Sequence, residues 1–401
     1  MCGIVALYGK QSEKNLWEMV EKVHHRGPDE DDLCKFDNLY LGHKRLSIIG
    51  PDLGHQPIPN ETGDINVIVN GEIYNYRLLK ERLGGHTFST KSDSEVVVHL
   101  YEEMGTQCVQ ELDGMFAFVL SDHGKPFAAR DTLGIKPLYY AEDDNGIYFA
   151  SELKCLVGIT DKIFEFPPGH FYTPESGIKP YRELKAPYTG IKDWNDNKME
   201  EAMANIRSKL EQAVVKRLMA DVPLGVLLSG GLDSSLVSAI SRRHTAEKQL
   251  NSFCVGMEGG SDLPAARIVA DYLGTIHHEY VYTKQEVLEI LPKVIYYLES
   301  FDPSLIRSAV PTYFVSRLAA QHVKVILSGE GADELFSGYS YLKEIKSEEE
   351  LHEELLRSIK ALHNINLQRL DRMSMAHSIE GRVPFLDLDL VTYAAALPPE
   401  I

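Results

Sequence analysis

Length, composition and charge limit what this chain can be. Its 401 residues exceed one ordinary domain core, so two or three domains are expected. Its 41 lysines and arginines stand against 59 aspartates and glutamates, and the formal charge of −18 argues against sequence-independent binding of nucleic acid or of an anionic membrane. No apolar run reaches the ~18 residues needed to cross a bilayer, and no secretory signal opens the chain. We therefore expect a cytoplasmic protein without nucleic-acid or membrane partners.

Five cysteines are spread widely along the chain, at positions 2, 34, 108, 155 and 254. Their odd number and the lack of any C-x-x-C pair predict reduced thiols rather than a disulfide framework or a zinc site. Cys2 is distinct because it directly follows the initiator methionine, whose removal would make it the first residue. Since the residues after it suit a strand, a buried apolar role for Cys2 is the alternative.

The first 185 residues are expected to be rich in β-structure. Short strand-like runs closed by turn residues occur at 65–69, 115–120, 137–141 and 147–151. The polar, irregular stretch 183–198 predicts a linker, with the domain boundary near residue 195. We accordingly expect one domain over residues 1–190 and a second over residues 200–401.

Beyond the linker, helices and strands alternate. Apolar residues at every fourth position from Ile206 to Leu218 predict a helix that ends at residues 221–223. Strand-like runs at 225–228, 252–255 and 324–327 alternate with helices that begin near residues 234 and 262, which predicts a parallel sheet covered on both faces. Ser347 and Glu350 form a capping-box pattern, and from there on the chain is predicted to be wholly helical, residues 380–387 included.

The most specific motif is SGGLDSS at residues 229–235, directly after the predicted strand 225–228. Its glycines let backbone N–H groups approach an anion, its serines add hydroxyl donors, and the next helix directs its positive end to the same place. These features predict a phosphate cradle that is not a Walker A loop, because the G-x-x-x-x-G-K-[ST] pattern is missing. A flexible turn would explain the glycines but not Asp233, which suits bound phosphate only when a divalent cation accompanies it.

A second loop, SGEGADE at residues 328–334, follows the predicted strand 324–327. Open α/β sheets bind ligands at such carboxyl ends of strands. Its acids Glu330, Asp333 and Glu334 predict metal coordination or contact with a substrate amine, although a solvated acidic turn is the alternative for Glu334 alone. Arg307 is a candidate partner for a carboxylate or a phosphate, because its planar guanidinium suits both.

These motifs belong to an ordered set that resembles glutamine-hydrolysing asparagine synthetase. In the second half the set comprises SGGLDSS (229–235), LSGEGADE (327–334) and EGRVPFLD (380–387). In the first half it comprises CGI (2–4), RGPD (26–29), RLSI (45–48), NGEIYN (70–75), SDSE (92–95), GMFAF (114–118) and RDxxGIxPLY (130–139). The resemblance covers essentially the whole chain.

The resemblance implies a fold and an activity. The fold is an α+β αββα sandwich of the N-terminal-nucleophile hydrolase type, followed by a Rossmann-like α/β ATP-pyrophosphatase domain with a helical C-terminal part. In the activity, ATP activates the side-chain carboxylate of aspartate as an acyl-adenylate, and ammonia released from glutamine displaces AMP. Glutamine, aspartate and ATP with Mg²⁺ are thus expected, without an organic prosthetic group, and a homodimer is left open.

For the first domain the resemblance implies a glutaminase. Cys2, freed by removal of the methionine, would attack the glutamine amide and form a glutamyl thioester, with its own α-amino group as the base. The Asn70 side chain and the Gly71 N–H would form the oxyanion hole and contact glutamine. Arg45 would bind the α-carboxylate of glutamine. Its α-ammonium would be bound by Glu72 and Asp93.

Structural interpretations of these first-half residues stand beside the functional ones. The segment 70–75 alone could form an Asn-Gly turn between strands, and Asp93 could cap the following helix. RGPD at 26–29 is interpreted as a turn that shapes the glutamine pocket. His24 and His25 lack further ligands at suitable spacing and are interpreted as structural.

For the second domain the resemblance assigns the site mainly to the two glycine-bearing loops. Asp233 and Asp333 are the expected Mg²⁺ ligands, and Leu228 and Val255 are expected beside the adenosine. The pyrophosphate would be bound by Ser229, Gly230, Gly231, Asp233, Ser234 and Ser235, and the nucleotide and aspartate site would be completed by Ser328, Gly329, Glu330 and Asp333, with Arg307 as a further candidate. An apolar ammonia tunnel between the domains is also implied, for which Met115 and Ile135 are candidate lining residues, with core packing as their alternative.

The C-terminal end departs from the family pattern. Family members continue past the VPFLD segment to a Gly-x-x-Lys stretch that contributes a lysine to the phosphates, and no equivalent lysine can be named in this sequence, which ends ALPPEI. Three functions therefore stay open: asparagine synthesis, a related ATP-dependent amidation of another carboxylate, and glutaminase or nucleotide-binding activity alone. Cys2 argues against a β-lactam-forming relative, since that branch does not need the nucleophile.

Overall fold

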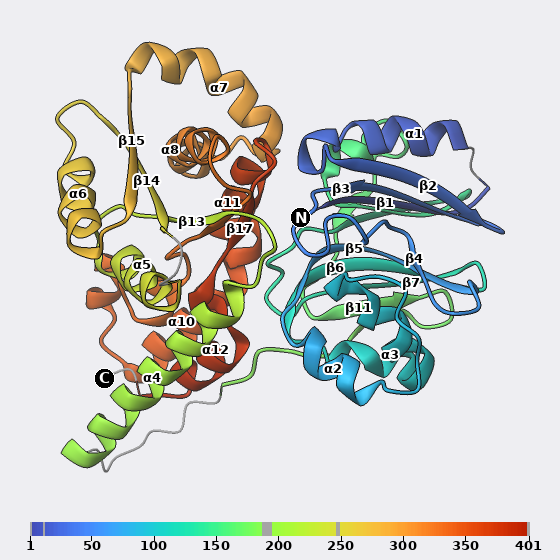
Figure 1. The fold of residues 1–401 in the computed structure, drawn as a ribbon, viewed down its shortest axis with the longest axis horizontal. Helices are drawn as coiled ribbons and strands as arrows, with labels where there is room; N and C mark the ends of the chain where they lie inside the picture. The colour runs from blue at the N-terminus through green and yellow to red at the C-terminus, as the bar shows by residue number, and fades with distance from the viewer. Residues whose placement is uncertain (1, 11–12, 187–194, 246–248, 399–401) are drawn as a thin grey trace.

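The computed structural model describes residues 2–10, 13–186, 195–245 and 249–398. Figure 1 shows two halves side by side, with stacked sheets in the first and a helix-covered sheet in the second. Residues 187–194 of the expected linker lie outside the described residues. The helix that follows begins at Asp196, inside the stretch predicted to be irregular.

The first half contains two six-stranded antiparallel sheets. One has the order β10-β8-β9-β1-β3-β2 and the other β12-β11-β7-β6-β5-β4. The strands of the first sheet are β1 (Cys2–Gly9), β2 (Glu30–Phe36), β3 (Leu39–Arg45), β8 (Tyr139–Asp143), β9 (Gly146–Ala150) and β10 (Ile163–Glu165). Those of the second are β4 (Ile58–Pro59), β5 (Ile65–Ile73), β6 (Gly114–Asp122), β7 (Lys125–Arg130), β11 (His170–Thr173) and β12 (Gly177–Pro180). The four predicted strand runs correspond to β5, β6, β8 and β9, which confirms them.

Apolar side chains from alternate strand positions fill the space between the two sheets, because successive residues of a strand face opposite sides. Ile4 and Leu41 from one sheet meet Ile68 and Val119 from the other. Helix α1 (Glu13–Glu21) packs on the outer face of the first sheet, and α2 (Tyr76–Arg82) and α3 (Val96–Met104) pack on that of the second. The resulting order of layers, helix, sheet, sheet, helix, confirms the expected αββα sandwich.

The second half is built on a five-stranded parallel sheet with the order β15-β14-β13-β16-β17. Its strands are β13 (Leu224–Leu227), β14 (Asn251–Met257), β15 (Ile276–Tyr282), β16 (Val325–Leu327) and β17 (Glu380–Arg382). Its helices are α4 (Asp196–Arg217), α5 (Leu232–His244), α6 (Asp262–Leu273), α7 (Lys284–Leu298), α8 (Pro303–Ala319), α9 (Ala332–Leu335), α10 (Glu348–Ala361), α11 (Asn366–Met375) and α12 (Leu388–Ala395). The alternation predicted from the sequence is confirmed.

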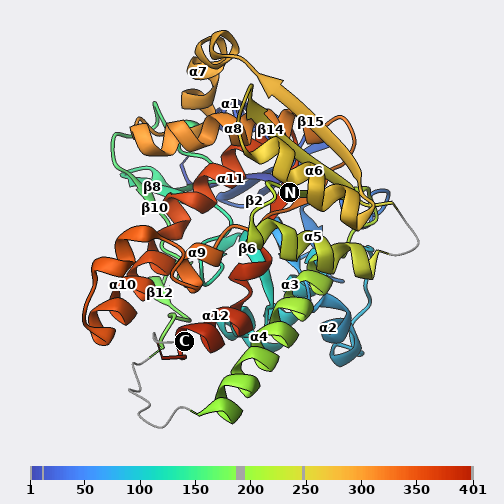
Figure 2. The same ribbon diagram turned by 90° about the vertical axis from the view of Figure 1, so that its left-hand side faces the viewer.

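Helices cover both faces of this sheet, as a parallel sheet requires. Val237 of α5 and Ala266 of α6 pack on one face, while Val315 and Ala319 of α8 pack on the other with Phe253 of β14. Figure 2, which views the molecule from the side of the second half, shows α4, α5 and α6 across the front. Gly274 ends α6 in a left-handed conformation. At the start of α10 the Ser347 side chain accepts a hydrogen bond from Glu350 N, which is one of the two bonds of the predicted capping box.

One secondary-structure prediction was wrong. Residues 380–387 were predicted to be helical, but Glu380–Arg382 form strand β17, which pairs in parallel with β16 and completes the sheet, and a single 3₁₀ turn, Pro384–Leu386, follows. The strand has only three residues, two of them charged, so it carries no apolar alternation that could reveal it. Both charged side chains are fully buried, because they face the first half of the molecule.

The two halves share apolar packing. Met115, Leu133 and Ile135 of the first half belong to the same buried cluster as Leu370 and Leu386 of the second. A second shared cluster joins the segment after β3 to α4 and to the parallel sheet. Among the helices that the structure describes, none combines the length and the apolar character that crossing a bilayer needs.

Candidate active sites

The first site begins at the thiol. Cys2 is the first residue of β1, where it pairs with Arg45 at the end of β3. Its backbone N donates a hydrogen bond of 3.1 Å to Oδ1 of Asn70, which lies on β5 of the other sheet. Cys2 is 6 % exposed, and burial raises the pKa of its thiol, while Arg45 lowers it. Arg45 and Asn70 are 43 and 68 positions from Cys2 in the sequence. Strand pairing and the stacking of the two sheets bring them to the thiol.

Asn70 and Gly71 occupy the middle of the site. Asn70 is fully buried, and its Nδ2 has no hydrogen-bond partner among the described residues, although buried amide donors are normally paired. Gly71 has φ +156°, and a Cβ there would lie 2.0 Å from the carbonyl oxygen of Met115, so only glycine fits. A free donor held beside a thiol is what stabilisation of an oxyanion needs. The segment lies within β5 and forms no turn at these two positions, so the turn interpretation fails there.

Carboxylates gather on the other side of Asn70. Glu72 and Asp93 are each 3 % exposed, and Glu380 of β17 is fully buried nearby. Burial first, and then the neighbouring carboxylates, raise the pKa of Glu72 well above its usual range. Burial, partly offset by the backbone hydrogen bond from Ile73, raises the pKa of Asp93 to about 6. Against the effect of burial, Arg382 and also Lys136 lower the pKa of Glu380 to about 2, so the deficit of positive charge falls on Glu72 and Asp93.

Asp93 does not act as the simple helix cap that was the alternative interpretation. Its Oδ2 accepts a hydrogen bond of 2.7 Å from Ile73 N on β5. The side chain that caps the 3₁₀ turn Asp93–Glu95 is that of Ser92, which accepts from Ser94 N. The carboxylate of Asp93 is therefore held against the strand that carries Asn70 and Glu72.

Arg45 is buried beside Cys2, but its guanidinium already has partners. Its Nη1 lies 3.0 and 2.9 Å from the two carboxylate oxygens of Glu30, and its Nη2 donates to the carbonyl oxygen of Gly50 at 2.8 Å. Glu30 also faces His55. A ligand carboxylate at Arg45 would therefore compete with Glu30.

The RGPD segment does more than shape a turn. Arg26 is fully buried and forms two hydrogen bonds, of 2.8 and 3.0 Å, with the carboxylate of Asp371 on α11 of the second half. It also pairs with Glu152 at 2.8 Å and donates from Nε to the carbonyl oxygen of Cys2 at 3.0 Å. Arg26 thus fastens the start of β1 to the other half. No local signal could reveal this, because Asp371 is 345 residues away.

The second site lies where the order of the parallel sheet reverses, between β13 and β16. Such switch points open a crevice at the carboxyl ends of the strands. The SGGLDSS loop joins β13 to α5, and the SGEGADE loop joins β16 to α9. Gly230 has φ +80°, and a Cβ there would lie 2.4 Å from the backbone of Ala265. A Cβ at Gly329 would lie 3.0 Å from Ser234 N, so the two loops touch.

A cavity of about 430 Å³ lies between these loops. Asp233 and Asp333 both line it, and burial together with Asp333 raises the pKa of Asp233. Ser229 Oγ and Ser234 Oγ lie 3.0 Å apart at its edge. Two carboxylates beside hydroxyl groups and the N-terminus of α5 can hold a phosphate together with a divalent cation such as Mg²⁺.

Several residues of this cavity were assigned no role from the sequence. Arg369 of α11 lines it and pairs with Glu330 at 2.6 Å. Glu334 is 3 % exposed and accepts hydrogen bonds from Tyr339 and Asn366, so the alternative of a solvated acidic turn was wrong. These partners come from α11 and from the segment after α9, where no motif marks them.

Other expected site residues lie outside this cavity. Arg307 is exposed on α8 and is not among its lining residues. Leu228 is buried against α6 in a cluster with Cys254 and Ala266, and Val255 packs on the opposite side of the sheet against α8. Their expected contacts with substrate stay predictions.

Strand β17 connects the two sites directly. Arg382 Nη2 lies 3.5 Å from Glu72 Oε2 in the first site, and its Nε lies 2.5 Å from Glu380. The carbonyl oxygen of the same residue accepts a hydrogen bond of 2.9 Å from Ser328 N in the second site. One residue therefore contacts a carboxylate of the first site and a loop of the second.

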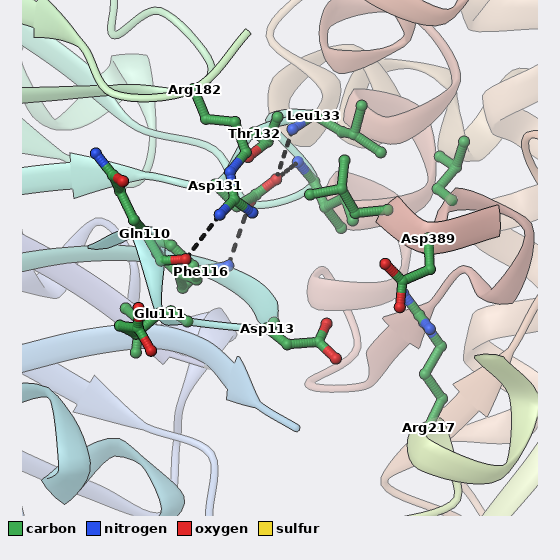
Figure 3. A pocket seen from close by; sticks show the side chains of 15 residues that line it. Gln110, Glu111, Asp113, Phe116, Asp131, Thr132, Leu133, Arg182, Arg217 and Asp389 are labelled. Atoms are coloured by element: carbon green, nitrogen blue, oxygen red, sulfur yellow. Dashed lines mark hydrogen bonds between the residues drawn. The ribbon is translucent and has the colours of Figure 1, made fainter. Parts of the chain in front are cut away.

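A smaller cavity, of about 160 Å³, lies between the two halves (Figure 3). Asp131, Thr132 and Leu133 approach it from the first half, and Arg217 and Asp389 approach it from the second. The carboxylate of Asp131 accepts backbone N–H groups of its own loop, those of Leu133 and Ile135 among them. Ile135 lines this cavity, whereas Met115 lies in the neighbouring apolar cluster.

Comparison with known proteins adds independent information. A family model described as "Glutamine amidotransferase domain" matches residues 1–175, and one described as "Asparagine synthase" matches residues 205–349 and 343–401. "Asparagine synthetase [glutamine-hydrolyzing] 2" of Arabidopsis thaliana is 43% identical over 425 residues, which cover 100% of this chain and 72% of the relative. The protein of the same name from Oryza sativa subsp. japonica is also 43% identical, with 100% and 70% covered. A solved structure of glutamine phosphoribosylpyrophosphate amidotransferase from B. subtilis is 16% identical over 72% of this chain and 70% of that chain, with a TM-score of 0.40, and adds nothing to the fold described above.

Proposed function

Since the chain belongs to the glutamine-hydrolysing asparagine synthetase family, we propose that Cys2 hydrolyses glutamine and that the loops after β13 and β16 activate aspartate. The activity is ATP-dependent synthesis of asparagine, and glutamine, aspartate and ATP are the substrates. The observation that carries the assignment of roles is the contact of Cys2 with Asn70, whose buried amide donor has no partner among the described residues.

The proposed glutaminase step begins once the initiator methionine has been removed. The α-amino group of Cys2 then accepts the thiol proton, and Sγ attacks the side-chain amide carbon of glutamine. Asn70 Oδ1, which accepts from Cys2 N at 3.1 Å, orients that amine, and Asn70 Nδ2 donates to the oxyanion. The C–N bond breaks, ammonia leaves with the proton, and water hydrolyses the glutamyl thioester to glutamate.

The carboxylates beside Asn70 suit the α-ammonium of glutamine. Glu72 and Asp93 are buried, and their pKa values are raised mainly by that burial. A substrate cation supplies the missing positive charge and favours their ionised forms. The α-carboxylate of glutamine would bind Arg45 by displacing Glu30 from part of the guanidinium.

In the proposed synthetase step, the side-chain carboxylate of aspartate attacks the α-phosphorus of ATP and pyrophosphate leaves. The product, β-aspartyl-AMP, then reacts with ammonia, and AMP leaves as asparagine forms. The glycines, serines and helix N-terminus at residues 229–235 bind the departing pyrophosphate. Asp233 and Asp333 would hold Mg²⁺, which supplies charge neutralisation at the phosphates.

Arg369 is proposed as a phosphate or carboxylate partner in this step. Among the described residues that line the cavity, it is the only one with a permanently charged cationic side chain, and its partner Glu330 lies in the same cavity. It thereby offers a cation where relatives are expected to use a lysine. Arg307, which lies exposed on α8, is the weaker candidate.

Three further assignments are proposals. Domains over residues 1–190 and 200–401 are supported by the separate hydrophobic cores of the two halves. A cytoplasmic location fits the five cysteines, which are all free thiols. An apolar ammonia path is supported by the shared cluster that contains Met115 and Ile135. A homodimer stays a prediction without a specific observation in its favour.

The test supplies the purified chain with ATP, Mg²⁺ and aspartate, and with either glutamine or ammonium chloride. With either nitrogen donor, asparagine, AMP and pyrophosphate should form in amounts equal to one another. Glutamate should form only from glutamine. Replacing aspartate by glutamate or by a β-amino acid tests the alternative acceptors. Glutamate release without AMP would reduce the proposal to glutamine hydrolysis alone.

A further inference from the structure

Four side chains in the first half form a cluster that neither site uses. Glu61 lies in the turn before β5, His86 follows α2, and His99 and Glu102 lie three positions apart on α3. One nitrogen or carboxylate oxygen from each of them lies within 4.8 Å of all the others. His99 is fully buried and the other three are partly exposed, so the cluster is open to solvent on one side.

The distances within the cluster fit a single tetrahedral ion. His86 Nδ1 lies 3.1 Å from Glu61 Oε1 and 3.6 Å from Glu102 Oε2. His99 Nδ1 lies 3.4 Å from Glu61 Oε2 and 3.2 Å from Glu102 Oε2. Ligands about 2.0–2.1 Å from a tetrahedral zinc ion are separated from each other by roughly 3.4 Å. These four nitrogen–oxygen distances lie on either side of that value, but they involve both oxygens of Glu61, so binding of the ion requires one of these oxygens to move toward both imidazoles.

A carboxylate lies behind each histidine, and the one behind His86 is within hydrogen-bond distance. His86 Nε2 lies 3.2 Å from Glu103 Oε1, and His99 Nε2 faces Glu95 Oε1 at 3.9 Å. A proton on each Nε2 leaves the lone pair of Nδ1 for a metal, as in carboxylate–histidine–zinc arrangements. The two Nδ1 atoms are the ones that face Glu61 and Glu102.

The two carboxylate ligands are held in the same way. Asn60 Nδ2 donates to Glu102 Oε1 at 2.8 Å and leaves Oε2 to face the histidines. Thr87 N donates to Glu61 Oε1 at 2.8 Å. His86, Glu61 and Glu102 therefore each have a hydrogen-bond partner that fixes their direction, and Glu95 faces His99 Nε2 without a hydrogen bond.

The charges in this region favour a cation. Glu61, Glu95, Glu102 and Glu103 surround the two imidazoles, and in the described part of the chain no lysine or arginine nitrogen lies within 4.0 Å of these carboxylates. Two protonated histidines could neutralise part of this charge, but their positive rings would then repel each other, since the ring centroids are 4.7 Å apart. A divalent ion removes that repulsion and offsets the negative charge.

We propose that Glu61, His86, His99 and Glu102 bind one Zn²⁺ ion in a structural site. The donor set of two imidazoles and two carboxylates suits Zn²⁺ rather than Mg²⁺, which prefers oxygen ligands and retains water. The ion joins the turn before β5 and the loop after α2 to helix α3. Because α3 follows directly on the turn that carries Asp93, the ion also fixes one side of the glutamine site.

The test uses the full chain, freed of metal with EDTA and desalted, and titrated with zinc chloride in a calorimeter and in thermal unfolding. We expect one equivalent of zinc to bind and, at 100 times Kd, a rise in melting temperature of roughly 5 °C or more. Mg²⁺ at the same concentration should not produce this rise. No activity measurement is needed, so the result is independent of the proposed function.

His86→Asn and His123→Asn form a matched pair of variants. His86 is a proposed ligand, whereas His123 is 70 % exposed in its side chain, lies outside the cluster and has a positive φ that asparagine tolerates. His86→Asn should weaken zinc binding about 100-fold and abolish the thermal shift, and His123→Asn should keep both. Glu61→Gln, on the exposed side, should also weaken binding.

Two results would overturn the proposal. One is the absence of saturable zinc binding to the metal-free chain. The other is equal zinc affinity in His86→Asn, His123→Asn and the unchanged protein, which would place the bound zinc elsewhere. Circular dichroism of the metal-free variants shows that a loss of binding does not come from unfolding.

Discussion

Residues of the proposed glutamine site lie on the strands of a sandwich and are almost fully buried, whereas the proposed nucleotide site is formed by two loops around an open cavity. Cys2, Asn70 and Glu72 are each no more than 6 % exposed. Asp233 and Glu330 line a cavity of about 430 Å³. Burial gives the first site fixed donors and strongly raised pKa values, while the loops of the second site leave room for a large substrate and for a metal ion. The difference makes the two sites separable by mutation.

Cys2→Ala should separate them most strongly. Without the thiol, glutamine-dependent asparagine synthesis should fall by about 10⁴-fold or more, because no thioester forms. Ammonia-dependent synthesis should stay near the wild-type rate, since ammonia enters after that step. The two rates are measured as asparagine formed from glutamine or from ammonium chloride.

Cys34→Ala is the matched control, since Cys34 is a free, partly exposed thiol on β2 outside both sites. It should leave both rates unchanged. Equal loss of both rates in Cys2→Ala would mean that the two sites are not separate.

The contact between the halves is expected to depend on buried charge. Arg26→Met removes the two shortest contacts of Asp371, which among the described residues keeps only Arg372 at 3.4 Å, and one partner of Glu152, which keeps Lys154 and Arg372. Removal of one member of a buried ion pair typically costs about 3–5 kcal/mol. Urea unfolding should show this loss. In the same variant, the ratio of glutamate released to asparagine formed should rise, because Arg26 also holds the start of β1.

Lys125→Met tests whether the loss of stability depends on burial of the ion pair or only on removal of a charge. Lys125 pairs with Glu175 at 2.8 Å, but both side chains are 62 % exposed. Its removal should leave the stability close to that of the unchanged protein. A similar loss in both variants would show that the interface pairs are no stronger than surface pairs.

Asp233→Asn should impair the loop site and spare the strand site. Loss of the carboxylate removes a proposed Mg²⁺ ligand beside the phosphates, so synthesis from either nitrogen donor should fall by about 10²–10³-fold. Glutamine hydrolysis, measured as glutamate release without aspartate, should persist. Asp271→Asn, an exposed position on α6, should change neither reaction. Loss of glutamine hydrolysis in Asp233→Asn would contradict the separation of the sites.

The difference between a site on contiguous loops and a site on paired strands also explains what could be predicted from the sequence. The loop motifs 229–235 and 328–334 are contiguous, and each follows its strand directly, so both the cradle and its place in the parallel sheet were visible. The αββα sandwich was implied by resemblance, and four of its strands were visible as apolar runs. Asn70 was assigned to Cys2 through that resemblance alone, because sheet register brings them together over 68 residues.

Partners from distant segments could not be predicted. Strand β17 was interpreted as helix because two of its three residues are charged, Glu380 and Arg382. These side chains pair with each other, and Arg382 also faces Glu72 of the other half. Arg26 and Asp371 are 345 residues apart. The cluster around His86 and His99 is drawn from three separate segments without a recognised ligand spacing. Long-range pairs of this kind depend on the completed fold.

The smallest expected effect concerns pH at the strand site. Burial raises the pKa of Asp93 to about 6, so the carboxylate is ionised above that pH and neutral below it. The free enzyme should therefore lose attraction for the α-ammonium of glutamine as pH falls through about 6, and kcat/KM for glutamine should fall up to tenfold per unit. Because Glu72, Glu380 and Arg382 face the same space, the observed pKa belongs to the group as a whole.

Asp93→Asn should remove the part of the acid limb near pH 6 and lower kcat/KM at pH 8, because the amide cannot ionise and attracts the α-ammonium less. The part set by protonation of the proposed base, the α-amino group of Cys2, should stay. Asp144→Asn, an exposed position between β8 and β9, should keep the wild-type profile. Glutamate release from pH 5 to pH 8 measures both. A wild-type acid limb no steeper than that of Asp93→Asn would mean that the carboxylates are already ionised without substrate. Arg382 would then be enough to balance the buried carboxylates of the strand site. The deficit of positive charge inferred from the raised pKa values of Glu72 and Asp93 would not exist.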